Sequence, residues 1–223
     1  MLAPRNVSNT FFESRMHDRV RASLSNSWVE IDDCASSFHR ARSHFEEEGD
    51  LARLGDLHFR RGMGFLAKKE YENALREFEL TTALSETLPS ARLACLAKLG
   101  KANVYYEQQD FRVALRLADQ SLEGFWLQED NVILAEVFLL KGKICRALKK
   151  FEFAEWFFQT SLRLYSSHEN REGVAECNYQ LGMLLELRGR HTEARRMFER
   201  SSATRDALAV RGKDASGSSG NSV

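Results

Sequence analysis

A few short motifs in the sequence carry residue types that bind nucleotides. Gly62-Met-Gly64-Phe-Leu-Ala67 matches the dinucleotide pattern G-x-G-x-x-A, in which a helix N-terminus holds a pyrophosphate. That chemistry requires a β-strand directly before the motif, whereas here we expect the motif inside a helix. We therefore interpret its glycines as helix-packing positions. Gly100-Lys101 and Gly142-Lys143 lack the upstream glycine and the Ser or Thr of a phosphate-binding loop.

The side chains that could bind metals or catalyse reactions do not occur at the spacings that known metal or catalytic sites require. The 6 histidines form no H-x-x-x-H pair, and the 4 cysteines lie far apart, with no C-x-x-C pair and no zinc spacing. No G-x-S-x-G nucleophile elbow occurs, and Glu46-Glu47-Glu48 is typical of a solvated linker. We therefore expect no catalytic residue, no metal, no cofactor and no small-molecule substrate, so the chain is not expected to be an enzyme.

Composition narrows the class of protein further. The 223 residues include 32 Lys and Arg against 32 Asp and Glu, and this balance argues against a nucleic-acid partner or a polybasic membrane anchor. Hydrophobic residues make up 43%, which is enough to bury a core, and only 2 prolines occur, which favours helices. The longest apolar stretch, Val132 to Leu140, is interrupted by Glu136 and is too short to span a membrane. With no signal peptide and cysteines typical of reduced core thiols, a cytoplasmic location is expected.

The elements that position these residues follow an internal repeat. Four segments begin about forty residues apart, and each opens on an aromatic residue or histidine that is followed three residues later by alanine. The segments are YENALREFEL, FRVALRLADQ, FEFAEWFFQT and HTEARRMFER. The position four residues after that alanine is aromatic in three of the four segments. One further period upstream, the equivalent positions are Ile31, Cys34 and Phe38, which makes a fifth copy.

The first half of each unit is equally regular. A small residue recurs twelve positions before each alanine, at Ala22, Gly62, Ala102, Gly142 and Gly182. Small residues let two helices approach closely, and the aromatic residue fills the space beside that contact. Each unit is therefore predicted to be a helix–turn–helix hairpin. Because such a hairpin cannot bury its apolar face alone, five of them should stack into one elongated solenoid.

This pattern resembles the tetratricopeptide repeat. Gly182, Leu185, Ala194 and Phe198 match its glycine, large apolar, alanine and aromatic positions, and the unit beginning near residue 54 matches likewise. The units exceed the common length of about 34 residues, and forty-residue units resemble the long-repeat adaptors of the Leu-Gly-Asn type. The resemblance implies an all-α, right-handed α-solenoid of about five hairpins. We expect an N-terminal extension over 1–13, units at about 14–53, 54–93, 94–133, 134–173 and 174–209, and a disordered Gly/Ser-rich tail over 210–223.

The activity that the resemblance implies is protein binding along the concave surface formed by the first helices. Lys143 and Arg146 are expected to be exposed there, because a buried unpaired charge is costly. Leu99 and Leu139, at equivalent positions, are explained as well by core packing between repeats. The implied groove residues are Phe59, Arg60, Met63, Leu66, Asn103, Tyr106, Lys143, Arg146, Tyr179, Gln180, Met183 and Glu186.

Two functions remain open at this point. The first is an adaptor or scaffold that binds a peptide or helix segment of another protein in this groove. The alternative is a structural subunit of a larger cytoskeletal or motor-associated assembly, which would use its outer surfaces and associate with the cytoskeleton. The carboxylate clamp that grips chaperone C-termini is not supported, because Phe59 and Met63 stand where Lys and Asn are needed. RNA binding is not expected either, because the groove charges are mixed.

Overall fold

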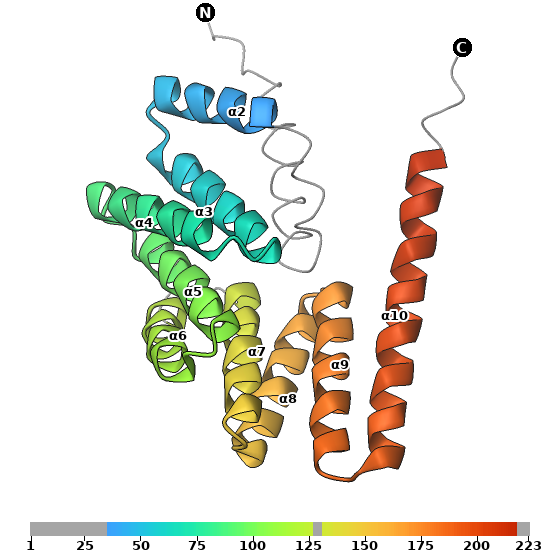
Figure 1. Cartoon of the computed structure of the whole chain (residues 1–223). Helices are drawn as coiled ribbons and strands as arrows, with labels where there is room; N and C mark the ends of the chain where they lie inside the picture. Colours follow the sequence, from blue (N-terminus) through green and yellow to red (C-terminus); the bar gives the residue numbers. More distant parts are fainter. Residues whose placement is uncertain (1–34, 127–130, 218–223) are drawn as a thin grey trace, which may run out of the picture.

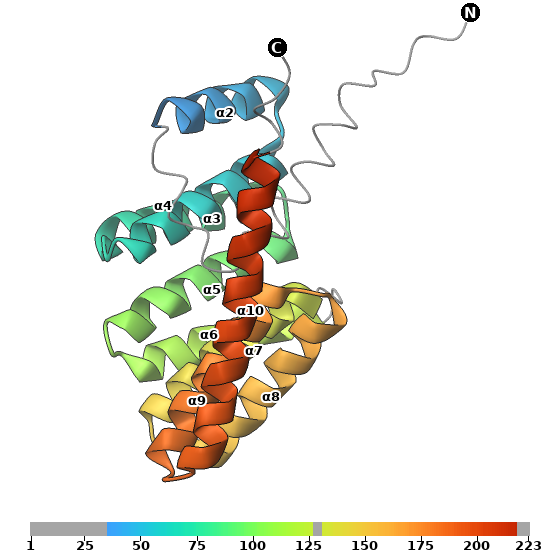
Figure 2. The same cartoon turned by 90° about the vertical axis from the view of Figure 1, so that its right-hand side faces the viewer.

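The computed structural model describes residues 35–126 and 131–217, and in these ranges every regular element is a helix. Figure 1 shows the helices succeeding one another along the molecule, and Figure 2 shows α2 to α9 arranged from top to bottom in one extended stack. The all-α solenoid expected from the sequence is confirmed. The described helices are α2 (Ala35–Glu48), α3 (Leu51–Ala67), α4 (Tyr71–Thr87), α5 (Ala91–Glu107), α6 (Phe111–Trp126), α7 (Asn131–Ala147), α8 (Phe151–Ser167), α9 (Arg171–Leu187) and α10 (His191–Gly217).

Consecutive helices pair as hairpins, namely α3 with α4, α5 with α6, α7 with α8 and α9 with α10, and each hairpin packs against the next. The first helices begin at Leu51, Ala91, Asn131 and Arg171, so the predicted boundaries at 54, 94, 134 and 174 are a few residues too late. The reason is capping. Side chains at Asp50, Ser90 and Asn170 accept hydrogen bonds from backbone N–H groups three residues on, so each helix starts ahead of the apolar pattern.

The ends of the molecule depart from the predicted domain layout. Residues 1–34 lie outside the described residues, and with them the predicted extension over 1–13 and the predicted first helix of the first unit; α2 occupies the position predicted for that unit's second helix. Helix α10 continues to Gly217, so the predicted disordered tail is wrong for residues 210–217. Extending an existing helix costs far less than nucleating one, which explains why a polar segment can continue α10. Residues 218–223 also lie outside the description.

The turns within the hairpins repeat one geometry. The residue after the helix C-cap adopts positive φ at Lys69, Gln109, Lys149 and Gly189, with values of 62°, 63°, 58° and 72°. The next residue's N–H then bonds back to a carbonyl of the last helical turn, as from Lys150 to Cys145 at 2.8 Å. These bonds satisfy orphan carbonyls at the helix end and set the angle at which the second helix returns.

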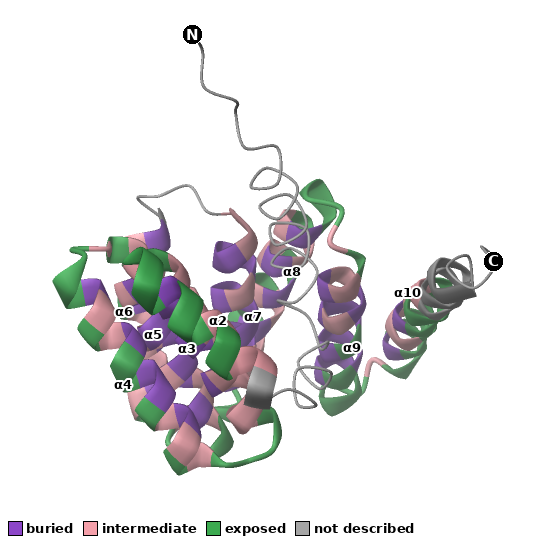
Figure 3. Ribbon diagram, turned by 90° about the horizontal axis from the view of Figure 1, so that it is seen from above, coloured by how far each residue is buried: buried purple, intermediate pink, exposed green. Residues whose placement is uncertain are grey.

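The core confirms the predicted contact between small and aromatic residues. A Cβ atom added at Gly142 would lie 2.5 Å from the Phe158 ring, and one added at Gly182 would lie 2.5 Å from the Phe198 ring. Ala154 is fully buried in the same hairpin as Phe158. In Figure 3 the buried residues gather where neighbouring helices face each other, whereas α10 presents mostly exposed residues. Close helix approach at the small positions is therefore the basis of each hairpin.

A buried hydroxyl also recurs with the repeat. Ser121, Ser161 and Ser201 donate hydrogen bonds from the second helix to first-helix carbonyls, at distances of 2.9, 2.7 and 2.8 Å. The acceptors are the carbonyls of Cys95, Ala135 and Ala175. These serines stand one period apart in the sequence, so the hydroxyl is a further element of the repeat.

Candidate partner-binding face

We define the first-helix face as the surface carrying the twelve implied groove residues on α3, α5, α7 and α9. On its N-terminal part, most of these residues serve internal packing. Phe59 is buried, and Met63 and Leu66 pack against the same hydrophobic core. Asn103 donates to the Leu99 carbonyl of its own helix at 3.0 Å, and the Tyr106 ring lies 5.9 Å from that of Phe111. Leu99 and Leu139 are buried core residues, which confirms their interpretation as packing residues.

Arg60 is the charged member of this N-terminal part. Partial burial lowers the pKa of Arg60, with Asp56 opposing and Arg92 reinforcing the change. Arg92 on α5 in turn bonds to Asp56 on α3 at 2.7 Å. The two arginines and one carboxylate therefore form a half-buried group that links neighbouring first helices.

A denser polar cluster lies on the C-terminal part of the face. The Lys143 ammonium on α7 lies 3.2 Å from the Glu176 carboxylate on α9, and Arg205 on α10 approaches the same carboxylate at 3.2 Å. Gln180 Nε2 donates to Glu176 at 2.8 Å, and the Tyr165 hydroxyl on α8 donates to Glu136 on α7 at 2.9 Å. We call these residues the Glu136–Glu176 cluster: Glu136, Lys143, Tyr165, Glu176, Gln180 and Arg205.

The prediction that Lys143 and Arg146 are exposed is wrong for both. Lys143 keeps only 26% of its side chain exposed and pairs with Glu176, and Arg146 is half-buried. Exposure would be required only if no carboxylate lay within reach of these side chains. The stacking of α9 on α7 supplies one, and an ion pair makes burial of the ammonium tolerable.

The cluster holds its two carboxyl groups in different states. Burial raises the pKa of Glu136 to about 7, and the charge of Glu176 adds to this, while the Tyr165 hydrogen bond and Lys143 oppose it. Burial also acts to raise the pKa of Glu176, but Lys143, Gln180 and Arg205 together outweigh it and the pKa is lowered. Near neutral pH, Glu176 is therefore ionised, whereas Glu136 is divided between its neutral and charged forms.

Two buried polar atoms on this face have no hydrogen-bond partner within the described part of the chain. They are the Arg146 Nη1 atom on α7 and the Gln180 Oε1 atom on α9. Lys143 on α7 contacts Glu176 on α9. Arg146 lies one helical turn after Lys143, and Gln180 lies one helical turn after Glu176. A donor and an acceptor thus remain unmet on adjacent helices, although more than about 90% of buried polar groups in proteins are paired.

Large apolar side chains lie exposed on α9 close to Gln180 in the sequence. Tyr179 is 38% exposed and Met183 is 37% exposed, and one helical turn separates them. The Tyr179 ring also contacts α10, where it lies 5.7 Å from the Phe198 ring and 5.5 Å from the Arg205 guanidinium. Glu186, the last implied groove residue, is exposed and lies 2.9 Å from His191.

The implied groove residues omit four members of the cluster, namely Glu136 and Glu176 on first helices and Tyr165 and Arg205 on second helices. A weak signal exists in the sequence, since the two members of each pair occupy equivalent positions one period apart. Among the described residues, no group of His, Cys, Asp or Glu is arranged to hold a metal ion, and no described helix has the length and apolarity to cross a membrane. Burial raises the pKa of the Cys177 thiol to about 12, with a Ser161 hydrogen bond opposing, so it is a poor nucleophile.

Comparisons with known proteins agree with this architecture. The structure resembles the crystal structure of BtubC (BKLC) from P. vanneervenii, with a TM-score of 0.61 and 16% sequence identity, over 81% of this chain and 78% of that one. At that identity the likeness concerns the fold alone. No curated protein shows significant sequence similarity. Residues 133–207, which hold most of the last two hairpins and the whole Glu136–Glu176 cluster, match the family model of the tetratricopeptide repeat, and this match supports the tetratricopeptide repeat family for the chain.

Proposed function

We propose that the protein is a non-catalytic, cytoplasmic adaptor that binds a peptide or helix segment of another protein on the first-helix face of α7 and α9. Tetratricopeptide repeats generally mediate protein–protein interaction, and residues 133–207 match that family. The forty-residue unit, which resembles Leu-Gly-Asn-type adaptors, supports the same function. We expect no nucleic-acid, membrane or small-molecule partner.

The observation that carries the proposal is the unmet pair on adjacent helices, the donor Arg146 Nη1 and the acceptor Gln180 Oε1. A peptide group has one carbonyl acceptor and one N–H donor, so main-chain amides of a partner can satisfy both atoms once side-chain rotation on binding uncovers them, since both are covered in the free chain. Each unmet buried group costs about 1–3 kcal/mol in the free protein, and binding would recover much of that cost. The exposed Tyr179 and Met183 lie beside the pair and would contact an apolar side chain of the same segment.

This arrangement changes the partner chemistry that the sequence suggested. Two free cations at Lys143 and Arg146 would favour a carboxylate, but Lys143 is already bonded to Glu176. The buried donor that remains unmet belongs to Arg146. A main-chain carbonyl or an amide side chain next to an apolar residue is therefore the better match.

The test uses Arg146→Met, which keeps the aliphatic stem and removes the donor. Arg163→Met is the matched control, because Arg163 is exposed on α8 and donates a hydrogen bond to Thr160 of its own helix, at 3.2 Å. Affinity purification with mass spectrometry identifies partners of the wild type, and calorimetric titration then measures each variant. We expect Arg146→Met to weaken binding by about tenfold or more, as for a binding hot spot. Equal affinity of wild type and both variants would place the partner elsewhere.

The alternative is a structural subunit of a larger cytoskeletal or motor-associated assembly. One observation favours it: Phe153 and Trp156 on the second helix α8 are 63% and 53% exposed. Large exposed aromatic groups are typical of protein interfaces. An adaptor should purify as a monomer at low concentration, whereas an assembly subunit should copurify with its complex in fixed stoichiometry.

A further inference from the structure

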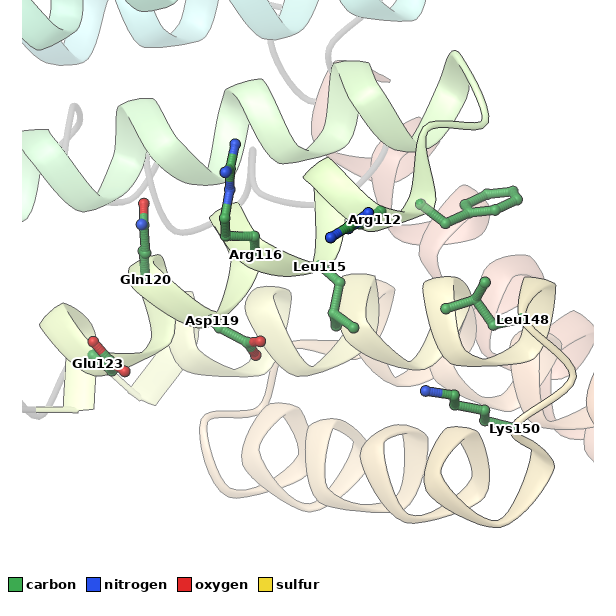
Figure 4. A pocket seen from close by; sticks show the side chains of 9 residues that line it. Arg112, Leu115, Arg116, Asp119, Gln120, Glu123, Leu148 and Lys150 are labelled. Carbon is green, nitrogen blue, oxygen red and sulfur yellow. The ribbon is translucent and has the colours of Figure 1, made fainter.

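A hollow of about 460 Å³ opens between α6 and the turn that joins α7 to α8. Figure 4 shows it from close by, with Leu115 of α6 and Leu148 of the turn facing each other. Arg112, Arg116 and Lys150 also line it. The hollow lies on the second-helix side of the solenoid and shares no residue with the Glu136–Glu176 cluster.

The charge around this hollow is positive. Asp119 contributes a carboxylate, but the Lys141 ammonium lies 2.6 Å from it and neutralises it. Arg112, Arg116 and Lys150 are exposed, and none of the three forms an ion pair within the described ranges. The remaining acidic lining residue, Glu123, lies at the end of the hollow away from Lys150 in Figure 4. All three cations border the hollow, although the Arg116 side chain extends away from Lys150 in Figure 4.

Exposed aromatic side chains continue from the hollow onto α8. The Lys141 ammonium that bonds Asp119 also lies 4.7 Å from the centre of the Phe157 ring. Phe157 packs edge-on against Trp156, with ring centres 5.1 Å apart, and more than half of Trp156 is exposed. Phe153, one turn earlier on the same helix, is still more exposed. Internal packing therefore leaves two large rings uncovered beside the cationic hollow.

We propose that the hollow and the α8 aromatics form a second docking surface, which binds an acidic segment of a partner protein that also carries large apolar side chains. Carboxylates of the segment would bond Arg112, Arg116 and Lys150, whose guanidinium and ammonium groups have no competing ion-pair partner among the described residues. Its apolar side chains would cover Leu115, Leu148 and the exposed rings, in the way that aromatic anchors act at interfaces. This surface lies apart from the first-helix face, so one chain can hold two partner segments at once.

The test measures fluorescence anisotropy of the full chain with a labelled peptide of repeated Glu-Glu-Phe. A matched peptide of repeated Lys-Lys-Phe serves as the charge control. We expect the acidic peptide to bind at least about tenfold more tightly, with an affinity that falls as salt rises, because exposed charges are screened. Equal binding of the two peptides would overturn the proposal, as would preferred binding of a labelled single-stranded RNA.

Variants then locate the binding site. Arg112→Glu with Arg116→Glu should weaken binding of the acidic peptide about tenfold or more. The control, Arg196→Glu with Arg200→Glu, makes the same change at the same spacing on exposed positions of α10 and should alter binding less than about twofold. Phe153→Ser with Trp156→Ser should also weaken binding. Circular dichroism checks that each variant is folded.

Two outcomes of the variant series would contradict the proposal: an unchanged affinity after the α6 charge reversal, or an equal loss in the α10 control. Arg146→Met should leave binding of the acidic peptide unchanged. That variant separates the two surfaces, since it is expected to affect only a partner of the first-helix face.

Discussion

Glu136→Gln is the most direct perturbation of the Glu136–Glu176 cluster. The amide has nearly the shape of the carboxyl group and keeps an oxygen that can accept the Tyr165 hydroxyl, which now donates to Glu136 at 2.9 Å. It cannot ionise. The variant therefore removes the proton equilibrium at this position and leaves the hydrogen bond and the packing in place.

The size of the effect follows from the pKa of Glu136, which burial raises from 4.5 to about 7 in the folded protein. The folded state keeps this proton over a range in which the unfolded chain has released it. The stability associated with neutral Glu136 is therefore fully present below pH 4.5 and is lost as the pH rises through about 7. Each pH unit inside this window costs up to about 1.4 kcal/mol, so the wild type should lose about 2.5 kcal/mol between pH 5 and pH 8 from this group. Glu136→Gln should not have this loss.

Urea denaturation of both proteins at pH 5, 6, 7 and 8 measures the difference. We expect the stability of Glu136→Gln relative to wild type to grow by about 2.5 kcal/mol across the series. Glu79→Gln, at an exposed position of α4, is the control and should follow the wild-type curve. If wild type and Glu136→Gln run parallel from pH 5 to pH 8, the Glu136 carboxyl is ionised throughout, and the reasoning from burial is refuted.

Three further predictions concern the solenoid itself. Ala154→Phe should lower the free energy of unfolding by about 1–3 kcal/mol, because Ala154 is fully buried where helices meet; an unchanged melting temperature would contradict this packing. Lys149→Gly should raise the free energy of unfolding in urea by about 0.5–1 kcal/mol, because φ at Lys149 is 58° and glycine adopts that conformation without strain; a loss of stability would refute the argument. Small-angle X-ray scattering should give a radius of gyration clearly above the value of roughly 17 Å for a compact chain of this length, since each hairpin contacts only its neighbours.

The fold could be predicted from the sequence because its determinants are local and repeated. Gly142, Ala154 and Phe158 stand at separations that place them on the facing sides of two short helices, and the same separations return one period later. Helical geometry converts such separations into directions without knowledge of distant contacts. The exposure of Tyr179 and Met183 could be anticipated on the same basis.

The polar partners of the first-helix face were decided by tertiary structure. The position of Lys143 on α7 predicts which way its side chain points, but its pairing with Glu176 depends on how far α9 is rotated and shifted when it packs on α7. Tyr165 and Arg205 reach the cluster from second helices, through a superhelical stacking that no single unit encodes. The pKa of Glu136 and the unmet donor of Arg146 follow from that stacking, because desolvation and hydrogen-bond supply depend on every neighbour at once. The repeat therefore determined the scaffold, and the contacts between its units determined the chemistry of the binding face.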